Sequence, residues 1–343
     1  MALLPEITGL YKPNKNQTGI FKLTNLQESK FRDLLEFLEC SAVAGKTKIL
    51  YRGENLGNLQ NKLGGDANTP NGLSDIYKKC FFLGDKAKGF LLAGKCAKPL
   101  YNWDFNIGSA SDEDFEYIFS EISKLVTDRK ASIFSLIEDE FYNFFINSGN
   151  LELFLETVKV VSDDRERLLL RDYYLWILHN LGADSFKYSS YFVSSTTNLN
   201  TALASAYMNG VDAKPILFVC FLPSPTQYFG LTLEDINILS TKTLDLGLPC
   251  YTNSIYEENE TSLKGALFPH FILGIHEFET GRFIVNKHVF EDDNRSLSSV
   301  LRYGLTIDQQ NFDNFISETN LKGGVITNHI GRFDAAGKRA GEG

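Results

Sequence analysis

The chain has 343 residues, of which 43% are hydrophobic and 22% are charged. These values are typical of a globular protein and exclude a collagen, a coiled-coil rod and a disordered chain. The 34 Lys and Arg residues are outnumbered by 43 Asp and Glu residues, so the net charge is −9. This charge argues against nonspecific nucleic-acid binding through a global positive field, and leaves room only for a local basic groove.

The first predicted elements are a helix and a strand. Thr24-Asn-Leu-Gln27 is typical of a helix start, and hydrophobic residues at helical spacing follow it as far as Gly45, where the helix should end. Residues 48–54 (Lys-Ile-Leu-Tyr-Arg-Gly-Glu) indicate a short strand that ends in a glycine turn. The polar stretch 57–72, rich in Asn and Gly, predicts a surface loop.

The middle of the chain is predicted to be helical. Ser111 is followed by three acidic residues and by hydrophobic residues at helical spacing, which indicates a capped helix. Further helical patterns continue to Gly182, so residues 111–182 should be mostly helical. The pattern then changes, and we predict strands at 191–193, 215–223, 268–275 and 282–289, with helices at 198–208, 296–303 and 312–316.

Strands and helices do not alternate regularly, which favours an α+β fold over a doubly wound sheet. We expect an N-terminal helical segment (1–47), a single domain (48–330) that carries the helical insertion 111–182, and a flexible tail (331–343).

The sequence also predicts the cellular compartment. No apolar run approaches the roughly 18 residues that cross a bilayer, and Met1 to Lys12 lack the features of a secretory signal. The five cysteines are widely spaced, without a Cys-x-x-Cys pair or a His at zinc-ligand spacing, and are expected to be reduced and mostly buried. We therefore expect a cytoplasmic protein that does not enter a membrane.

Common nucleotide and hydrolase motifs are missing, including the P-loop, the dinucleotide glycine motif, His-Glu-x-x-His and Gly-x-Ser-x-Gly. Three other stretches are candidates for function. In Leu50-Tyr-Arg-Gly-Glu54, Arg52 ends a strand beside a glycine, where its planar guanidinium suits a phosphate. Alone, this pattern is more often a surface Arg beside a turn glycine.

The second stretch, Tyr191 to Asn198, ends a strand with the hydroxyl run Ser-Ser-Thr-Thr and introduces an Ala-rich helix. Such hydroxyls cap the helix or orient a ligand-binding group, and both interpretations stay open. The third stretch holds His270, Glu277 and Glu279 near a predicted hairpin. Two carboxylates on one side of a strand suit acid–base or cation-stabilising chemistry, although many such pairs are solvated edge residues.

Taken in order, the three stretches resemble the ADP-ribosyltransferase superfamily of the Arg–Ser–Glu type. Tyr51-Arg52-Gly53 resembles its first motif, Phe192-Val-Ser194-Ser195-Thr196 its second, and Glu277-Phe-Glu279 its third Glu-x-Glu motif. The resemblance implies a split antiparallel sheet as the core of the fold. If residues 268–273 form the third-motif strand, His270 occupies the position of the glutamate, and the choice among His270, Glu277 and Glu279 stays open.

A second likeness is to the FRG domain of bacterial and phage-defence proteins. Tyr51-Arg-Gly-Glu54 is similar to its opening motif, Leu178-His-Asn-Leu-Gly182 to its Gln-His-x-Gly segment, and residues 196–206 to its Thr-x-Asn-x-x-x-Ala-Leu-x-x-Ala segment. Residues 301–312 are similar to its closing helix. The two families are themselves distantly alike, so the two resemblances are compatible.

The resemblance implies NAD as the substrate and no metal. It implies that Arg52 holds the phosphates or the adjoining ribose, that Ser194 and Thr196 brace the site, and that Glu279 or Glu277 bonds the ribose and activates the acceptor. An aromatic ring of the run that ends at Phe192 would stack on the nicotinamide. The residues implied to contact NAD are Tyr51, Arg52, Gly53, Tyr191, Phe192, Ser194, Ser195 and Thr196.

The two resemblances also imply an acceptor and a biological role. The acceptor would be a macromolecule (RNA, DNA or protein), and the enzyme would act as an intracellular toxin in a toxin–antitoxin or phage-defence system, restrained by an antitoxin protein. Two alternatives stay open from the sequence. One is a non-catalytic FRG-like module that binds a nucleotide or nucleic acid, and the other is an NAD glycohydrolase that uses water as the acceptor.

Overall fold

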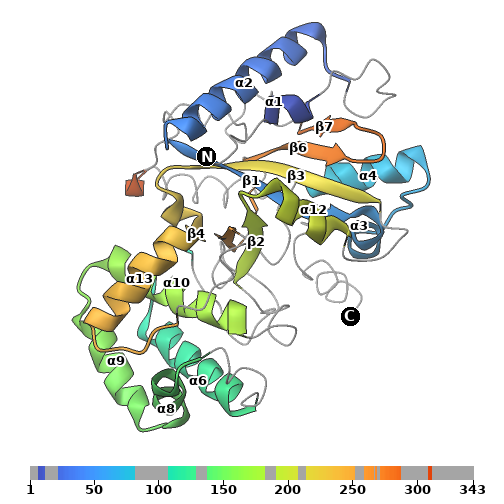
Figure 1. Ribbon diagram of the computed structural model, residues 1–343. Helices are drawn as coiled ribbons and strands as arrows, with labels where there is room; N and C mark the ends of the chain where they lie inside the picture. The colour runs from blue at the N-terminus through green and yellow to red at the C-terminus, as the bar shows by residue number, and fades with distance from the viewer. Residues whose placement is uncertain are drawn as a thin grey trace.

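The computed structural model describes residues 7–11, 22–81, 107–128, 137–181, 191–207, 214–251, 259–265, 267–268, 271–286 and 308–310. Within these ranges, helices are combined with one seven-stranded sheet, and every neighbouring pair of strands is antiparallel. The fold is therefore α+β, as expected from the sequence (Figure 1).

The strand order in the sheet is β4-β5-β2-β1-β3-β6-β7. The strands are β1 (Thr47–Asn55), β2 (Phe192–Thr196), β3 (Pro215–Pro223), β4 (Gly230–Thr232), β5 (Glu260–Lys264), β6 (Ile272–Glu277) and β7 (Phe283–Val285). Each of the nine residues of β3 is buried, which matches the continuous apolar run in the sequence. The order brings β1, β2 and β5 side by side, although β5 lies more than 60 residues beyond β2 in the chain.

The helices form two groups, as Figure 1 shows. Around the sheet are α1 (Ile7–Leu10), α2 (Asn25–Val43), α3 (Leu56–Leu63), α4 (Pro70–Cys80) and α12 (Leu199–Tyr207). The second group, called here the helical unit, consists of α6 (Asp112–Asp128), α8 (Asp139–Ile146), α9 (Asn150–Val160) and α10 (Asp164–Leu181). Beside α10 lies α13 (Leu233–Asp245), which follows a single 3-10 turn (Thr226–Tyr228) and β4.

Local sequence signals account for the predicted helix starts. Thr24 caps α2, accepting a hydrogen bond from the Gln27 backbone N–H while the Gln27 side chain accepts one from the Thr24 N–H. Ser111 and Asp114 form the same reciprocal pair at α6. Such pairs satisfy backbone donors that a helix start leaves unpaired. After α2, Gly45 adopts a φ of +70°, so the predicted end is also confirmed.

Each group of helices has a hydrophobic interior. In the helical unit, aromatic rings interlock at edge-to-face and tilted angles, among them Phe119, Phe145, Phe154 and Tyr174. These rings are buried, and edge-to-face contact adds to the stabilisation from their burial. These rings belong to the same hydrophobic core as the buried residues of the sheet.

The prediction of a surface loop over 57–72 holds for residues 64–69 and is wrong on either side of them. Residues 56–63 form α3, capped by the side chain of Asn55, and Pro70 begins α4 behind the cap residue Thr69. Leu59 and Leu63 are buried at helical spacing, and this burial outweighs the low helix propensity of the surrounding Gly and Asn. The predicted helices at 296–303 and 312–316, and the tail 331–343, lie outside the described residues.

The cysteine prediction is confirmed in part. The four described cysteines are free thiols, with Cys80 and Cys220 buried, Cys250 half-buried and Cys40 exposed. Cys96 lies outside the described residues.

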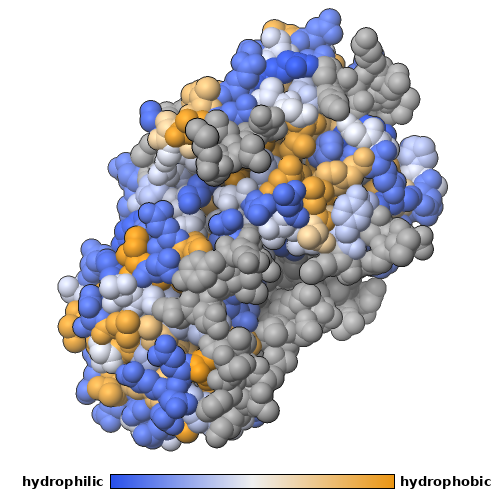
Figure 2. Space-filling view, in the orientation of Figure 1, coloured by the Kyte–Doolittle hydropathy of each residue, from blue (hydrophilic) through white to orange (hydrophobic). Residues whose placement is uncertain are grey.

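In Figure 2, hydrophilic side chains cover much of α2 and of the helical unit, interspersed with hydrophobic ones.

Candidate functional site

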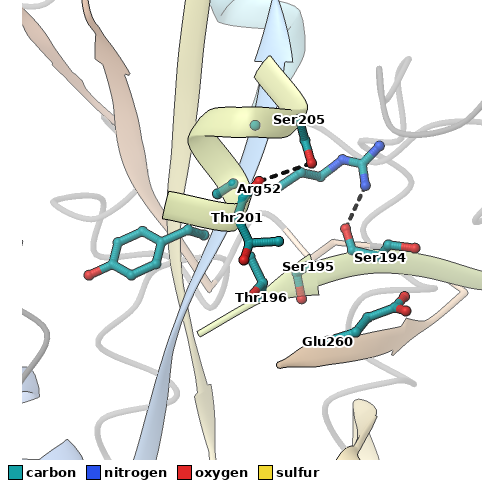
Figure 3. A pocket seen from close by; sticks show the side chains of 10 residues that line it. Arg52, Ser194, Ser195, Thr196, Thr201, Ser205 and Glu260 are labelled. Carbon is teal, nitrogen blue, oxygen red and sulfur yellow. Dashed lines mark hydrogen bonds between the residues drawn. The ribbon is translucent and has the colours of Figure 1, made fainter. Parts of the chain in front are cut away.

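A pocket with a cavity volume of about 110 Å³ opens where β1, β2, β5 and α12 meet. It is lined by Tyr51, Arg52, Gly53, Ser194, Ser195, Thr196, Thr201, Ala202, Ser205 and Glu260. Figure 3 shows the guanidinium of Arg52 directed toward Ser194, with Glu260 on the neighbouring strand. The first two stretches singled out in the sequence thus come together at one pocket, although more than 130 residues separate them.

The strands β1 and β2 pair at one position, Tyr51 opposite Thr196. By contrast, β1 pairs with β3 along its whole length, from Thr47 to Asn55. Beyond the single β1–β2 pair, the Arg52 side chain bridges the strands, because its Nη1 donates a hydrogen bond to the backbone oxygen of Ser194. A side chain thus replaces the backbone ladder at the position where the pocket opens.

Arg52 is held by its neighbours but keeps binding capacity. Its Nη2 donates to Oε1 of Glu54 over 3.0 Å, and the Glu54 side chain is only 8% exposed. The buried Nε of Arg52 has no hydrogen-bond partner in the described part of the chain. A guanidinium fixed in this way, 20% exposed at a pocket, presents positive charge to an anionic ligand.

Ser194 and Glu260 form a second hydrogen-bonded group, together with His179 of α10. The Nε2 atom of His179 lies 3.0 Å from Oγ of Ser194 and 3.5 Å from Oε1 of Glu260. The hydroxyl of Ser262 donates to the same carboxylate oxygen over 3.2 Å. Burial raises the pKa of the Glu260 carboxyl, but hydrogen bonds from His179, Ser194 and Ser262 lower it below its ordinary value. Glu260 is therefore a carboxylate at neutral pH.

The close packing of α12 on β1 explains why a glycine follows Arg52. A Cβ atom at this position would lie 1.8 Å from the backbone oxygen of Ala202 and 2.8 Å from the backbone nitrogen of Ala206. The backbone of α12 therefore packs directly on β1, and the small Ala side chains of α12 allow the approach. This contact brings α12 over the pocket.

The remaining hydroxyls have structural partners. Ser195 donates to the backbone oxygen of Thr261 over 2.7 Å, and Thr196 Oγ1 accepts from the Asn198 backbone N–H over 2.9 Å. Ser205 donates to the Thr201 backbone oxygen over 3.1 Å. The hydroxyl run thus divides its roles: Ser195 and Thr196 fix the strand end, while Ser194 faces the carboxylate.

The third predicted stretch lies elsewhere. Glu277 ends β6 and Glu279 follows in the turn, and both line a separate pocket that shares no residue with the pocket around Arg52. Glu277 accepts hydrogen bonds from Tyr77, Thr280 and Arg282. The placement of Glu277 and Glu279 beside Arg52 is therefore corrected: three donors already engage Glu277, and Glu279 is exposed. His270 lies outside the described residues.

Of the three aromatic residues expected to contact NAD, Tyr51 lines the pocket, whereas Tyr191 and Phe192 do not. Tyr191 is 2% exposed and Phe192 is 3% exposed. The Tyr191 hydroxyl accepts a long hydrogen bond, 3.4 Å, from the fully buried Arg171, and the Phe192 ring packs near His179. Their rings are covered by protein, so neither offers a face on which a ligand ring stacks.

Glu260 and His179 are the site residues that the sequence-based prediction missed. A signal for Glu260 was present, since Glu258-Asn259-Glu260 has the same Glu-x-Glu spacing as Glu277 and Glu279. Glu260 begins a strand that is short and polar, so the sequence pattern does not indicate a strand there. His179 lies within a segment that the FRG likeness marked without assigning it a role.

Within the described ranges, no three His, Cys, Asp or Glu side chains cluster so as to hold a metal ion. None of the helices in these ranges has both the length and the apolar character that crossing a bilayer demands. The chain matches no protein-family model, no curated protein and no solved structure.

Proposed function

We propose that the protein is an NAD-dependent ADP-ribosyltransferase whose active site is the pocket around Arg52. One observation carries the proposal: an Arg, a Ser and a Glu, on the adjacent strands β1, β2 and β5, line the same pocket. The sequence resemblance calls for the same three residue types in the same chain order. Glu260 takes the third position in place of Glu277 or Glu279.

The sheet supports the same proposal. A split core, as in the ADP-ribosyltransferase fold, needs two strands that separate beside the binding site. The single paired position between β1 and β2, next to the pocket, fits this requirement. Glu258-Asn259-Glu260 supplies a Glu-x-Glu sequence at the start of β5, as the third motif of that family requires.

Each residue has a role that its surroundings suit. Arg52, already oriented by Glu54, binds the phosphates of NAD or the adjoining ribose. Glu260, ionised and held by hydrogen bonds, accepts a hydrogen bond from a ribose hydroxyl and stabilises positive charge that develops at the ribose. Ser194 fixes the position of the Glu260 carboxylate through their shared contact with His179.

In the reaction, the bond between ribose C1′ and the nicotinamide nitrogen breaks, and nicotinamide leaves with the bonding electron pair. A nucleophile of the acceptor forms the new bond to C1′ and releases its proton to solvent. No oxidant or reductant takes part. The chain supplies a fixed negative charge beside a cationic transition state, which is a common source of large rate enhancements.

We propose a macromolecule as the acceptor, and an antitoxin protein that restrains the enzyme inside the cell. This part of the proposal is supported by the FRG-like motifs, including Tyr51-Arg-Gly-Glu54. The Gly53 contact with α12 gives one of those motifs a physical reason, because only glycine fits between β1 and α12.

Incubation with NAD labelled in the adenylate part, together with separate pools of cellular protein, RNA and DNA, tests the function. We expect label to become attached to one of the three pools and free nicotinamide to appear in step. Nicotinamide and free ADP-ribose without any labelled pool would instead identify a glycohydrolase. NAD binding without nicotinamide release would identify a binding module and would contradict the proposed transferase.

A further inference from the structure

We propose that His179 is a positioning residue of this active site, which holds Glu260 and Ser194 in place, so that the helical unit supplies part of the catalytic machinery. The inference rests on the proposed function. It assigns a role to a histidine that lies outside the three strands of the Arg–Ser–Glu arrangement.

The contacts of His179 link the two groups that the reaction needs. Its Nε2 lies within 3.0 Å of the Ser194 hydroxyl and 3.5 Å from the Glu260 carboxylate. The side chain of His179 is 17% exposed and that of Glu260 is 24% exposed, so neither is freely solvated. The Nε2 atom thus lies between a hydroxyl and a carboxylate. The Phe192 ring packs near the imidazole.

The position of His179 is fixed by a second link between the same helix and the same strand. Asp172, seven residues earlier on α10, forms an ion pair of 2.5 Å with Lys264, four residues later than Glu260 on β5. Asp172 and Lys264 are 0% and 1% exposed. Seven helical residues span about 10.5 Å and four strand residues about 13.5 Å, so the two links match in spacing.

Two such links determine both the rotation of α10 and its position along β5. The buried link is reinforced because Arg171 also pairs with Asp172, over 2.6 Å, and is itself fully buried. Leu178 and Leu181, on either side of His179, are buried as well. His179 therefore projects from a rigid helix end, as a residue that orients a catalytic group must.

Two substitutions at His179 separate a positioning role from a packing role. In His179→Gln, the side-chain amide places an N–H donor close to the position of Nε2. In His179→Phe, the ring that packs against Phe192 is kept and the donor is lost. For nicotinamide release, we expect His179→Gln to keep most of the wild-type kcat. We expect His179→Phe to lose about 100-fold in kcat with a smaller change in KM for NAD.

The opposite order of activities, with Phe active and Gln inactive, would show that His179 only fills space and would overturn the inference. His276→Phe is the matched control, because His276 lies on β6 and outside the pocket. This control should keep wild-type kcat.

A measurement without turnover separates failure of this inference from failure of the proposed function. The carboxyl titration of Glu260 in the free protein, followed by NMR, should move to higher pH in His179→Phe and stay nearly unchanged in His276→Phe. An unmoved titration in His179→Phe would overturn the positioning role even in an active enzyme. If the wild type releases no nicotinamide, the function fails, while the titration still decides whether His179 holds Glu260.

Discussion

The guanidinium of Arg52 donates a hydrogen bond to the backbone oxygen of Ser194, beside the one position at which β1 and β2 pair. This contact connects two strands whose backbones otherwise separate, and it lies at the edge of the pocket. The same guanidinium is paired with Glu54 on its other side. Arg52 thus contributes to the fold and to the proposed catalysis, and variants have to distinguish the two contributions.

Arg52→Ala, made alone and together with Glu54→Gln, makes that distinction. Arg52→Ala removes the ion pair of a nearly buried carboxylate, so we expect the free energy of unfolding to fall by about 1–3 kcal/mol in urea titrations. Adding Glu54→Gln removes the carboxylate charge and should recover part of the loss. Transfer of ADP-ribose should stay at least about 100-fold below wild type in both variants. Recovery of activity together with stability would show that Arg52 acts through folding alone.

A substitution at Gly53 tests the close approach of α12 to β1. In Gly53→Ala, the new methyl group would overlap the Ala202 backbone oxygen, which lies 1.8 Å from the Cβ position. Because a backbone atom cannot move as a flexible side chain does, we expect a loss of roughly 3 kcal/mol in the free energy of unfolding. Gly57→Ala in α3 is the control, since its Cβ meets nothing closer than 3.4 Å. It should be neutral or stabilising by up to about 1 kcal/mol. Equal effects of the two changes would contradict the packing described.

The buried ion pair between Lys264 and Asp172 predicts a large stability effect. Burial lowers the pKa of Lys264, and the charge of Asp172 acts in the opposite direction. Lys264→Met removes one buried cation from Asp172 and leaves its pairing with Arg171, and we expect the free energy of unfolding to fall by about 2–3 kcal/mol. Lys242→Met removes the exposed pair with Glu166 and should cost no more than about 1 kcal/mol. Urea unfolding of the two variants measures the difference, and similar costs would refute the buried pairing.

The pH dependence of stability reports on Glu277. Burial raises the pKa of this carboxyl, but hydrogen bonds from Arg282, Thr280 and Tyr77 lower it below the ordinary value of 4.5. The unfolded chain therefore binds a proton at higher pH than the folded protein does. The stabilisation is fully present above about pH 4.5 and is lost as the pH falls toward the folded-state pKa.

The matching variant is Glu277→Gln. Urea unfolding from pH 7 to pH 3 should show a shallower loss of stability in the acid range than wild type, together with a lower stability at pH 7. A wild-type acid slope in Glu277→Gln would mean that other carboxyls account for the decline. Nicotinamide release by the variant at pH 7 should stay close to wild type, because Glu277 lies outside the pocket that contains Arg52.

The sequence contained the signals for much of the fold and for part of the site. Helix caps at Thr24 and Ser111 are local patterns, and the structure has both. Arg52 and Ser194 were identified because each lies in a strand with a recognisable end. That they line the same pocket depends on the sheet order, which local patterns do not encode.

Glu260 was missed for a physical reason. Its strand, Glu-Thr-Ser-Leu-Lys, is mostly buried but lacks the hydrophobic run that is typical of a buried strand. Lys264 is buried through an ion pair with Asp172, and a sequence pattern does not reveal that partner. Glu277 ends a longer apolar strand, and the sequence pattern therefore favours it as the third-motif glutamate. Glu-x-Glu spacing occurs at residues 138–140, 258–260 and 277–279 of this chain. Only the pairing of β2 with β5, with Thr196 opposite Glu260, shows which one reaches the pocket.

The most direct test of the account compares the two glutamates that compete for the third position. Nicotinamide release from NAD should be measured for the wild type, Glu260→Gln and Glu279→Gln at equal protein concentration. We expect a fall of at least about 100-fold for Glu260→Gln and an unchanged rate for Glu279→Gln, since of the two only Glu260 lies at the Arg52 pocket. A wild-type rate in Glu260→Gln together with loss of activity in Glu279→Gln would contradict the account.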